Sequence, residues 1–171
     1  MGDLDRCHPD TSSTGMDEDP LTSTRGPNIA ENGSAEKWLE PLPVGWELHR
    51  DHESPVLEQE ASAKYVTDGA TAVKVSTTRH ATGILCKVFA DPNAAYKVVF
   101  DTTLAEGTAK LMLSTTTEIH LDHVPMPESG PTTSEYTVVT GDRDNYLGIY
   151  FTSTTPQATF YVDNVRVFKI A

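Results

Sequence analysis

Two short stretches of the sequence combine histidine with acidic side chains, which are residue types that bind transition metals. They are HRDHE at 49–53 and HLDH at 120–123. Zinc needs three or four such ligands in a tetrahedral arrangement. Positions i and i+3 of a strand point to opposite faces of a sheet, so either stretch would need a turn for its ligands to converge. We interpret both as loop histidines, with a transition-metal site as the alternative.

The sequence carries no signature of nucleophilic or phosphoryl-transfer catalysis. It has no Gly-x-Ser-x-Gly elbow, no phosphate-binding loop and no cysteine spaced for pairing with a histidine. Cys86 lies in an alternating apolar run, where a thiol acts as a small buried hydrophobe. A carboxylate pair could be chosen from 25 acidic residues, but the separation that glycoside cleavage requires cannot be read from sequence. We expect no enzymatic activity.

Charge and hydropathy exclude two classes of partner. The 171 residues carry 13 Lys and Arg against 25 Asp and Glu, a net charge of −12. Nucleic-acid binding needs clustered basic residues, so we expect no nucleic-acid partner. The longest apolar runs fall far short of the ~18 residues of a membrane helix, so we expect no membrane span. The first residues lack the pattern of a signal peptide, which favours a protein that stays cytoplasmic when synthesised.

Residues 1–27 differ in composition from the rest of the chain. They are rich in Ser, Thr, Gly and Pro, contain no aromatic residue, and carry six acids against two arginines. Such a segment buries too little apolar surface to offset its ordering entropy. We therefore predict an extended acidic N-terminal arm that binds a partner. The apolar anchors of this arm would be Leu4, Met16, Leu21 and Ile29.

From residue 28 onward, short alternating runs recur between turn residues, a pattern typical of an all-β sandwich. The run 84–89 is apolar on both sides, which predicts a central strand. The segment 55–63 fits either a short helix or an edge strand. We predict a two-sheet antiparallel jelly-roll sandwich over residues 28–171. Its predicted core includes Val73, Val75, Val98, Phe100, Leu111, Leu113, Leu147, Ile149, Val162 and Val165.

The beginning and the end of this region resemble a known family. Residues 28–38 read NIAENGSAEKW, residues 43–46 read PVGW, and residues 160–167 read FYVDNVRV. These stretches resemble the opening and closing motifs of jelly-roll carbohydrate-binding modules, the galactose-binding-like and family 4/9/22-like sandwiches. Similar sandwiches occur in phage virion decoration and tail proteins. The resemblance spans residues 28–171 and is more specific for the fold than for the function.

In the resembling modules, sugars bind on a concave sheet face or on the loops at one end. The resemblance therefore implies a glycan or partner surface built from aromatic side chains. A buried Trp or Tyr also covers on the order of 150–250 Å² of surface, so core or rim packing is the alternative for each. The candidates are Trp38, Trp46, Tyr65, Tyr136, Tyr146 and Tyr150.

The resemblance also implies a structural calcium ion. In such modules an acidic residue after the opening Asn-Gly and the Asp before the final strand lie together and bind calcium with backbone carbonyls. The matching residues are Glu36 and Asp163. Calcium takes about six to eight oxygen ligands, so the two carboxylates would join both ends of the sandwich. The alternative places Asp163 in a turn or bulge and leaves Glu36 solvated.

Two functions are compatible with these features. The first is a non-catalytic structural protein on a virion surface, as a capsid decoration or tail-associated protein. Its arm would bind capsid or tail proteins, and it would form a homo-oligomer such as a trimer. The second is a glycan-binding attachment module of a tail fibre, adhesin or hydrolase that binds a cell-surface glycan. We favour the first, because the acidic arm and the Thr-rich strands fit it.

Overall fold

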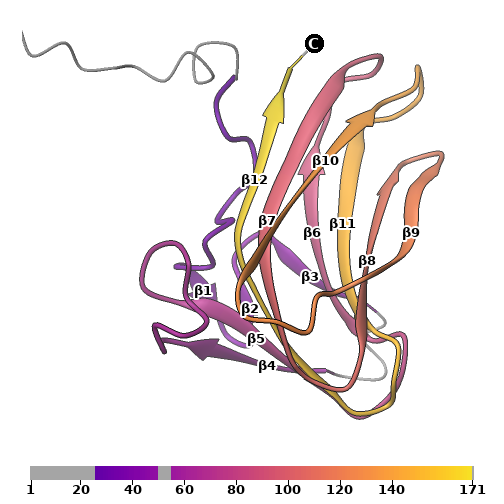
Figure 1. The fold of residues 1–171 in the computed structure, drawn as a ribbon. Coiled ribbons are helices and arrows are strands. Elements are labelled where there is room, and N and C mark those ends of the chain that lie inside the picture. Colours follow the sequence, from indigo (N-terminus) through magenta and orange to yellow (C-terminus); the bar gives the residue numbers. More distant parts are fainter. Residues whose placement is uncertain (1–25, 50–54, 171) are drawn as a thin grey trace, which may run out of the picture.

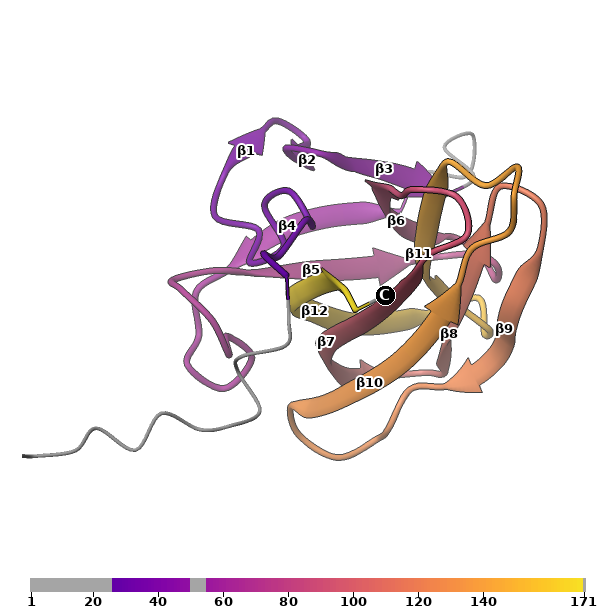
Figure 2. The same cartoon turned by 90° about the horizontal axis from the view of Figure 1, so that it is seen from above.

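The computed structural model describes residues 26–49 and 55–170, which form only strands, turns and loops. No helix in these two ranges could cross a membrane. Two large antiparallel sheets pack face to face (Figures 1 and 2), which confirms the predicted jelly-roll sandwich. The strands are β1 (Trp38–Leu39), β2 (Leu42–Pro43), β3 (Trp46–His49), β4 (Val56–Glu60), β5 (Ala72–Thr77), β6 (Gly83–Phe89), β7 (Ala95–Glu106), β8 (Ala109–Thr115), β9 (Ile119–Pro125), β10 (Thr132–Val139), β11 (Tyr146–Ser153) and β12 (Ala158–Lys169).

The chain crosses repeatedly between the two sheets. The first sheet has the strand order β10-β7-β12-β5-β4 and the second has the order β3-β6-β11-β8-β9, while β1 and β2 form a separate short hairpin. From β5 to β8, and again from β9 to β12, each strand lies in the opposite sheet from the strand before it. These crossings place strands that are distant in sequence side by side, as in other jelly rolls.

Apolar side chains from alternating strand positions fill the space between the sheets. All ten predicted core residues are at most 3% exposed, which confirms that prediction. Phe100 of β7 and Phe151 of β11 meet edge to face with ring centroids 5.1 Å apart, so aromatic packing joins the two sheets. Cys86 also lies in this core, where burial raises the pKa of its thiol to about 12. The thiol is therefore a packing group.

Two ambiguous stretches of sequence become strands with different surroundings. The segment that fits either a helix or an edge strand forms the edge strand β4. Strand β6 is interior, as predicted, because β3 and β11 flank it. Its outer face is open only toward the end of the strand, however, since Leu85 is buried there whereas Lys87 is exposed and Phe89 is 86% exposed. An apolar residue on each side of a strand does not by itself mean burial on each side.

The first described residues belong to the sandwich. Asn28 forms a bridge with Phe168, and the Ile29 N–H donates to the Val167 carbonyl at 2.8 Å beside the end of β12 (Figure 1). Ile29 is therefore part of the domain, which corrects its assignment as an arm anchor. The other proposed anchors, Leu4, Met16 and Leu21, lie outside the described residues.

Candidate functional site

A row of aromatic side chains lies on the outer face of the second sheet. Strand alternation points every second residue of β6 and β11 outward. In the register of these strands, Phe89 is directly opposite Tyr146, and Lys87 is opposite Gly148. Tyr146 and Tyr150 are half-buried, so each ring remains partly open to solvent. We call Phe89, Tyr146 and Tyr150 the aromatic platform.

The ring of Tyr150 lies over Gly148 of the same strand. A Cβ atom placed on Gly148 would be 2.7 Å from Tyr150 Cε2 and 3.2 Å from Ser114 Oγ. The ring therefore lies against the backbone of Gly148, which has no side chain to displace it. His49 of β3 packs edge-on against it, with ring centroids 5.2 Å apart and an interplanar angle of 82°. These contacts fix the position of the half-buried Tyr150 ring on the outer face.

Polar groups flank the aromatic platform. The ammonium Nζ of Lys87 lies 4.6 Å from the centroid of the Tyr146 ring, a cation–π contact. On the other side of β11, Ser114 of β8 is opposite Gly148, and Met112 is opposite Tyr150. The face thus combines flat apolar rings with hydrogen-bonding groups, which is the composition of many small-molecule sites.

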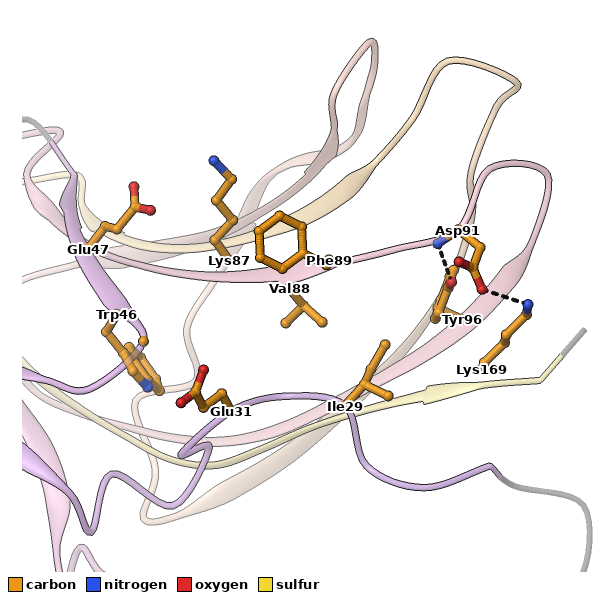
Figure 3. Close-up of a pocket in the computed structure, with 11 residues that line it drawn as sticks. Ile29, Glu31, Trp46, Glu47, Lys87, Val88, Phe89, Asp91, Tyr96 and Lys169 are labelled. Atoms are coloured by element: carbon orange, nitrogen blue, oxygen red, sulfur yellow. Dashed lines mark hydrogen bonds and ion pairs between the residues drawn. The ribbon is translucent and has the colours of Figure 1, made fainter.

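A groove of about 630 Å³ adjoins this face beyond the start of β3 (Figure 3). In Figure 3, Lys87 and Glu47 project to the side opposite Val88, toward the outer face of the sheet. An ion pair of 2.9 Å between Lys169 and Asp91 lies at its far end. The groove is lined by Ile29, Glu31, Gly45, Trp46, Glu47, Lys87, Val88, Phe89, Asp91, Tyr96 and Lys169.

Three of the predicted aromatic residues serve packing. Trp46 is only 4% exposed and stacks on Phe151 with centroids 6.4 Å apart. Tyr136 is half-buried and stacks on Phe100 with centroids 6.0 Å apart. Trp38 packs against the same core from the β1–β2 hairpin. None of these three rings presents an open face beside Tyr146 and Tyr150.

Tyr65 lies on the other sheet. It belongs to the loop 61–71 and stacks on Tyr161 of β12, with centroids 3.7 Å apart and an interplanar angle of 5°. A hydrogen bond from Lys64 lowers the pKa of Tyr65, whereas burial raises the pKa of Tyr161 to about 12. The sequence thus placed Tyr65, Tyr146 and Tyr150 in one candidate surface, but the fold separates the first from the other two.

The carboxylates proposed to share calcium both bind the loop 61–71. Asp163 is 1% exposed, and its Oδ2 accepts N–H groups of residues 67 and 68 at 2.6 and 2.9 Å. Glu36 Oε1 accepts N–H groups of residues 70 and 71 at 2.8 and 2.9 Å. Asp163 also stands at a register shift of β12, which agrees with the alternative of a bulge. Both carboxylates therefore hold one loop against the sandwich.

The surroundings of Asp163 are rich in hydrogen-bond donors. Asp101 lies opposite it on β7 and accepts hydrogen bonds from the Thr67 hydroxyl at 2.7 Å and the Asn164 amide at 2.9 Å. In this arrangement hydrogen-bond donors satisfy the oxygens of both carboxylates. Across residues 26–49 and 55–170, no group of three His, Cys, Asp or Glu side chains is arranged to hold a metal. A calcium ion shared with Glu36 stays a prediction of the resemblance.

The HLDH stretch at 120–123, which the structure describes in full, forms no metal-ligand cluster. Lys110 Nζ contacts Asp122 Oδ1 at 2.8 Å and His123 Nε2 at 3.2 Å, so an ammonium group occupies the space between them. The other ring nitrogen of His123 lies 2.8 Å from Asp122 Oδ2. Of residues 49–53, only His49 is among the described residues, and it packs on Tyr150.

The fold is the jelly roll found in carbohydrate-binding modules. No protein-family profile matches the sequence, and a search of curated proteins finds no match. Among solved structures, the chain is similar to the CBM22-1 xylan-binding domain of Paenibacillus barcinonensis Xyn10C, with a TM-score of 0.57 and 12% identity over 81% of this chain and 92% of that one. It is also similar to TmCBM61 in complex with β-1,4-galactotriose, with a TM-score of 0.54 and 14% identity over 84% and 99%.

A phage protein has the same fold. The enzymatically active domain of tailspike protein 4 from bacteriophage CBA120 aligns with a TM-score of 0.63 and 12% identity, over 84% of this chain. The chain spans only 21% of that structure. At sequence identities this low, the structural alignments show a shared fold alone. For the fold, they confirm the resemblance to carbohydrate-binding modules.

Proposed function

We propose that this domain binds glycans through the aromatic platform. The observation that carries the proposal is the group of three rings on the outer face of the second sheet: the half-buried Tyr150, whose ring lies over Gly148, the half-buried Tyr146 and the exposed Phe89. A pyranose ring has apolar C–H faces that pack on aromatic rings, while its hydroxyls can bond polar groups at the edge of the platform. The similarity to carbohydrate-binding modules supports this role over a purely structural one.

Calorimetric titration of the full chain with soluble xylan and β-1,4-galactan tests the proposal, since these classes occur in the descriptions of similar structures. Tyr150→Ala and Tyr146→Ala should each weaken binding about tenfold, because about 1.4 kcal/mol of lost stacking is a factor of ten. Tyr65→Ala is the matched control, because that ring lies on the first sheet. Platform variants that fold normally and bind like the wild type would exclude this site.

We further propose that the domain is displayed on a virion surface or a similar assembly and binds without cleaving. The similarity to a tailspike domain and the acidic composition of residues 1–27 support this context. Capsid or tail proteins would be the partners of the arm, with self-association as a trimer. A chain that lacks residues 1–25 should then fail to occupy the assembly, and no reducing ends should form when the full chain is incubated with bound glycan.

A further inference from the structure

Lys87 occupies a defined position on the glycan-binding face. It is exposed on β6 and lies opposite Gly148, over which the Tyr150 ring rests. Its Nζ lies 4.6 Å from the centroid of the Tyr146 ring. This cation–π contact restrains a side chain that is otherwise flexible, so the positive charge stands among the rings of the aromatic platform.

Lys87 contacts an aromatic ring and no described carboxylate, as Lys64 does on Tyr65 of the other sheet. The described ion pairs give a carboxylate to Lys74, Lys97, Lys110 and Lys169, and none of these pairs includes Lys87. An aromatic ring stabilises the charge without neutralising it. The ammonium group therefore keeps N–H donors available for an anion that approaches the platform.

Glu47 is a carboxylate on the same face. It pairs with Leu85 across β3 and β6, which makes it a diagonal neighbour of Lys87 at about 7–8 Å between Cα atoms. Both side chains project to the same side of the sheet in Figure 3, where no ion pair joins them. Glu47 lies at the groove rim, so it should oppose an anionic ligand there without cancelling the charge above the Tyr146 ring.

We infer that the aromatic platform binds an acidic glycan, a polysaccharide with uronate carboxylates, through an ion pair with Lys87. This inference rests on the proposed glycan-binding function. Covering an ammonium group with a neutral sugar removes water without supplying an opposite charge, whereas a carboxylate offsets that cost. Charge-assisted hydrogen bonds of this kind are about twice as strong as neutral ones. The ring would hold the pyranose, and Lys87 would select its carboxylate.

The negative net charge of the chain separates long-range electrostatic effects on glycan binding from local ones. At −12, long-range electrostatics repels a polyanion. A preference for the acidic form of a glycan can therefore arise only from local contacts on the binding face. Titrations at about 0.15 M salt limit the repulsion to roughly 8 Å and leave the short contact with Lys87 in place.

The test compares polygalacturonate and alginate with their carboxyl-reduced, neutral forms, by calorimetry with the full chain. For at least one of them, the wild type should bind the acidic form about tenfold more tightly, as a charge-assisted bond implies. Lys87→Gln should bring this affinity ratio close to one, and Lys87→Arg should keep it. Glu47→Gln should raise the ratio, because it removes the opposing carboxylate.

Three outcomes would overturn the inference. They are wild-type binding of acidic and reduced forms with equal affinity, an unchanged ratio in Lys87→Gln, or no binding of either acidic polysaccharide. The proposed glycan-binding function fails separately, namely if Tyr150→Ala binds neutral galactan or xylan as tightly as the wild type. A domain that binds only neutral glycans through Tyr150 would thus retain the first proposal and lose the second.

Discussion

The Tyr150 ring rests on Gly148, two residues earlier on the same outward face of β11. Neighbouring strands place Lys87 and Ser114 opposite this glycine on its two sides. The ring therefore fills a gap that any other residue at position 148 would occupy. The position of the Tyr150 ring thus depends on the absence of a side chain at Gly148 as much as on the aromatic residue itself.

Gly148→Ala should weaken glycan binding without unfolding the domain. The new Cβ would come within 2.7 Å of Tyr150 Cε2, so the ring, as the far end of a flexible side chain, would swing off the strand. We expect about tenfold lower affinity and a change in unfolding free energy within about 0.5 kcal/mol. Calorimetric titration and thermal melting measure both. Gly130→Ala is the control, since nothing lies within 4 Å of its added Cβ, and unchanged affinity in Gly148→Ala would show that ring orientation is unimportant.

Substitutions on the two faces of the second sheet should affect different properties. A substitution on the buried face should lower the stability of the domain, and one on the outer face should weaken glycan binding. Ile149 is fully buried, so Ile149→Ala should cost about 2–5 kcal/mol of unfolding free energy, measured by urea denaturation. Phe89 is 86% exposed, so Phe89→Ala should change that free energy by less than about 0.5 kcal/mol while weakening glycan binding. A large loss of stability in Phe89→Ala would mean that this ring packs against the domain.

The fold could be predicted from sequence because burial on one face imposes a period of two. A slip of one residue would expose a whole set of apolar side chains, so runs such as 73–75, 111–113 and 147–151 leave a single solution. This inference required only the positions of the alternating apolar residues and of the turns between them.

The site was less predictable, because it depends on which face each aromatic residue occupies. Trp46 and Tyr150 are both aromatic residues on strands, yet the register of the second sheet buries one and opens the other. Phe89 was missed because its run is apolar on both sides. One sequence signal could have indicated the platform: the spacing Tyr146-x-Gly148-x-Tyr150. On a strand it places two aromatic rings on one face, with a residue that has no side chain between them.

Chelator treatment tests the calcium prediction. The resemblance predicts a melting temperature that is higher in excess calcium than in EDTA, whereas carboxylates that only accept backbone N–H groups of the loop 61–71 predict the same melting temperature in both. Glu36→Gln keeps an acceptor oxygen and should cost less than about 1 kcal/mol. A bound ion would instead stabilise the domain by RT ln(1 + [L]/Kd). A melting temperature that rises with calcium, and no longer does so in Glu36→Gln, would establish the ion.

The last prediction concerns the pH dependence of stability at Asp163. Burial raises the pKa of this carboxyl above its ordinary value, although N–H groups of residues 67 and 68 act in the opposite direction. A group whose pKa is raised in the folded state contributes stability that is full below its ordinary pKa, about 3.9, and is lost as pH rises through the folded pKa. Asp163→Asn removes this titration. The difference in unfolding free energy between the wild type and Asp163→Asn should therefore be largest near pH 3 and shrink toward pH 7, as measured by urea denaturation. A difference that grows with pH would mean that the N–H donors outweigh burial.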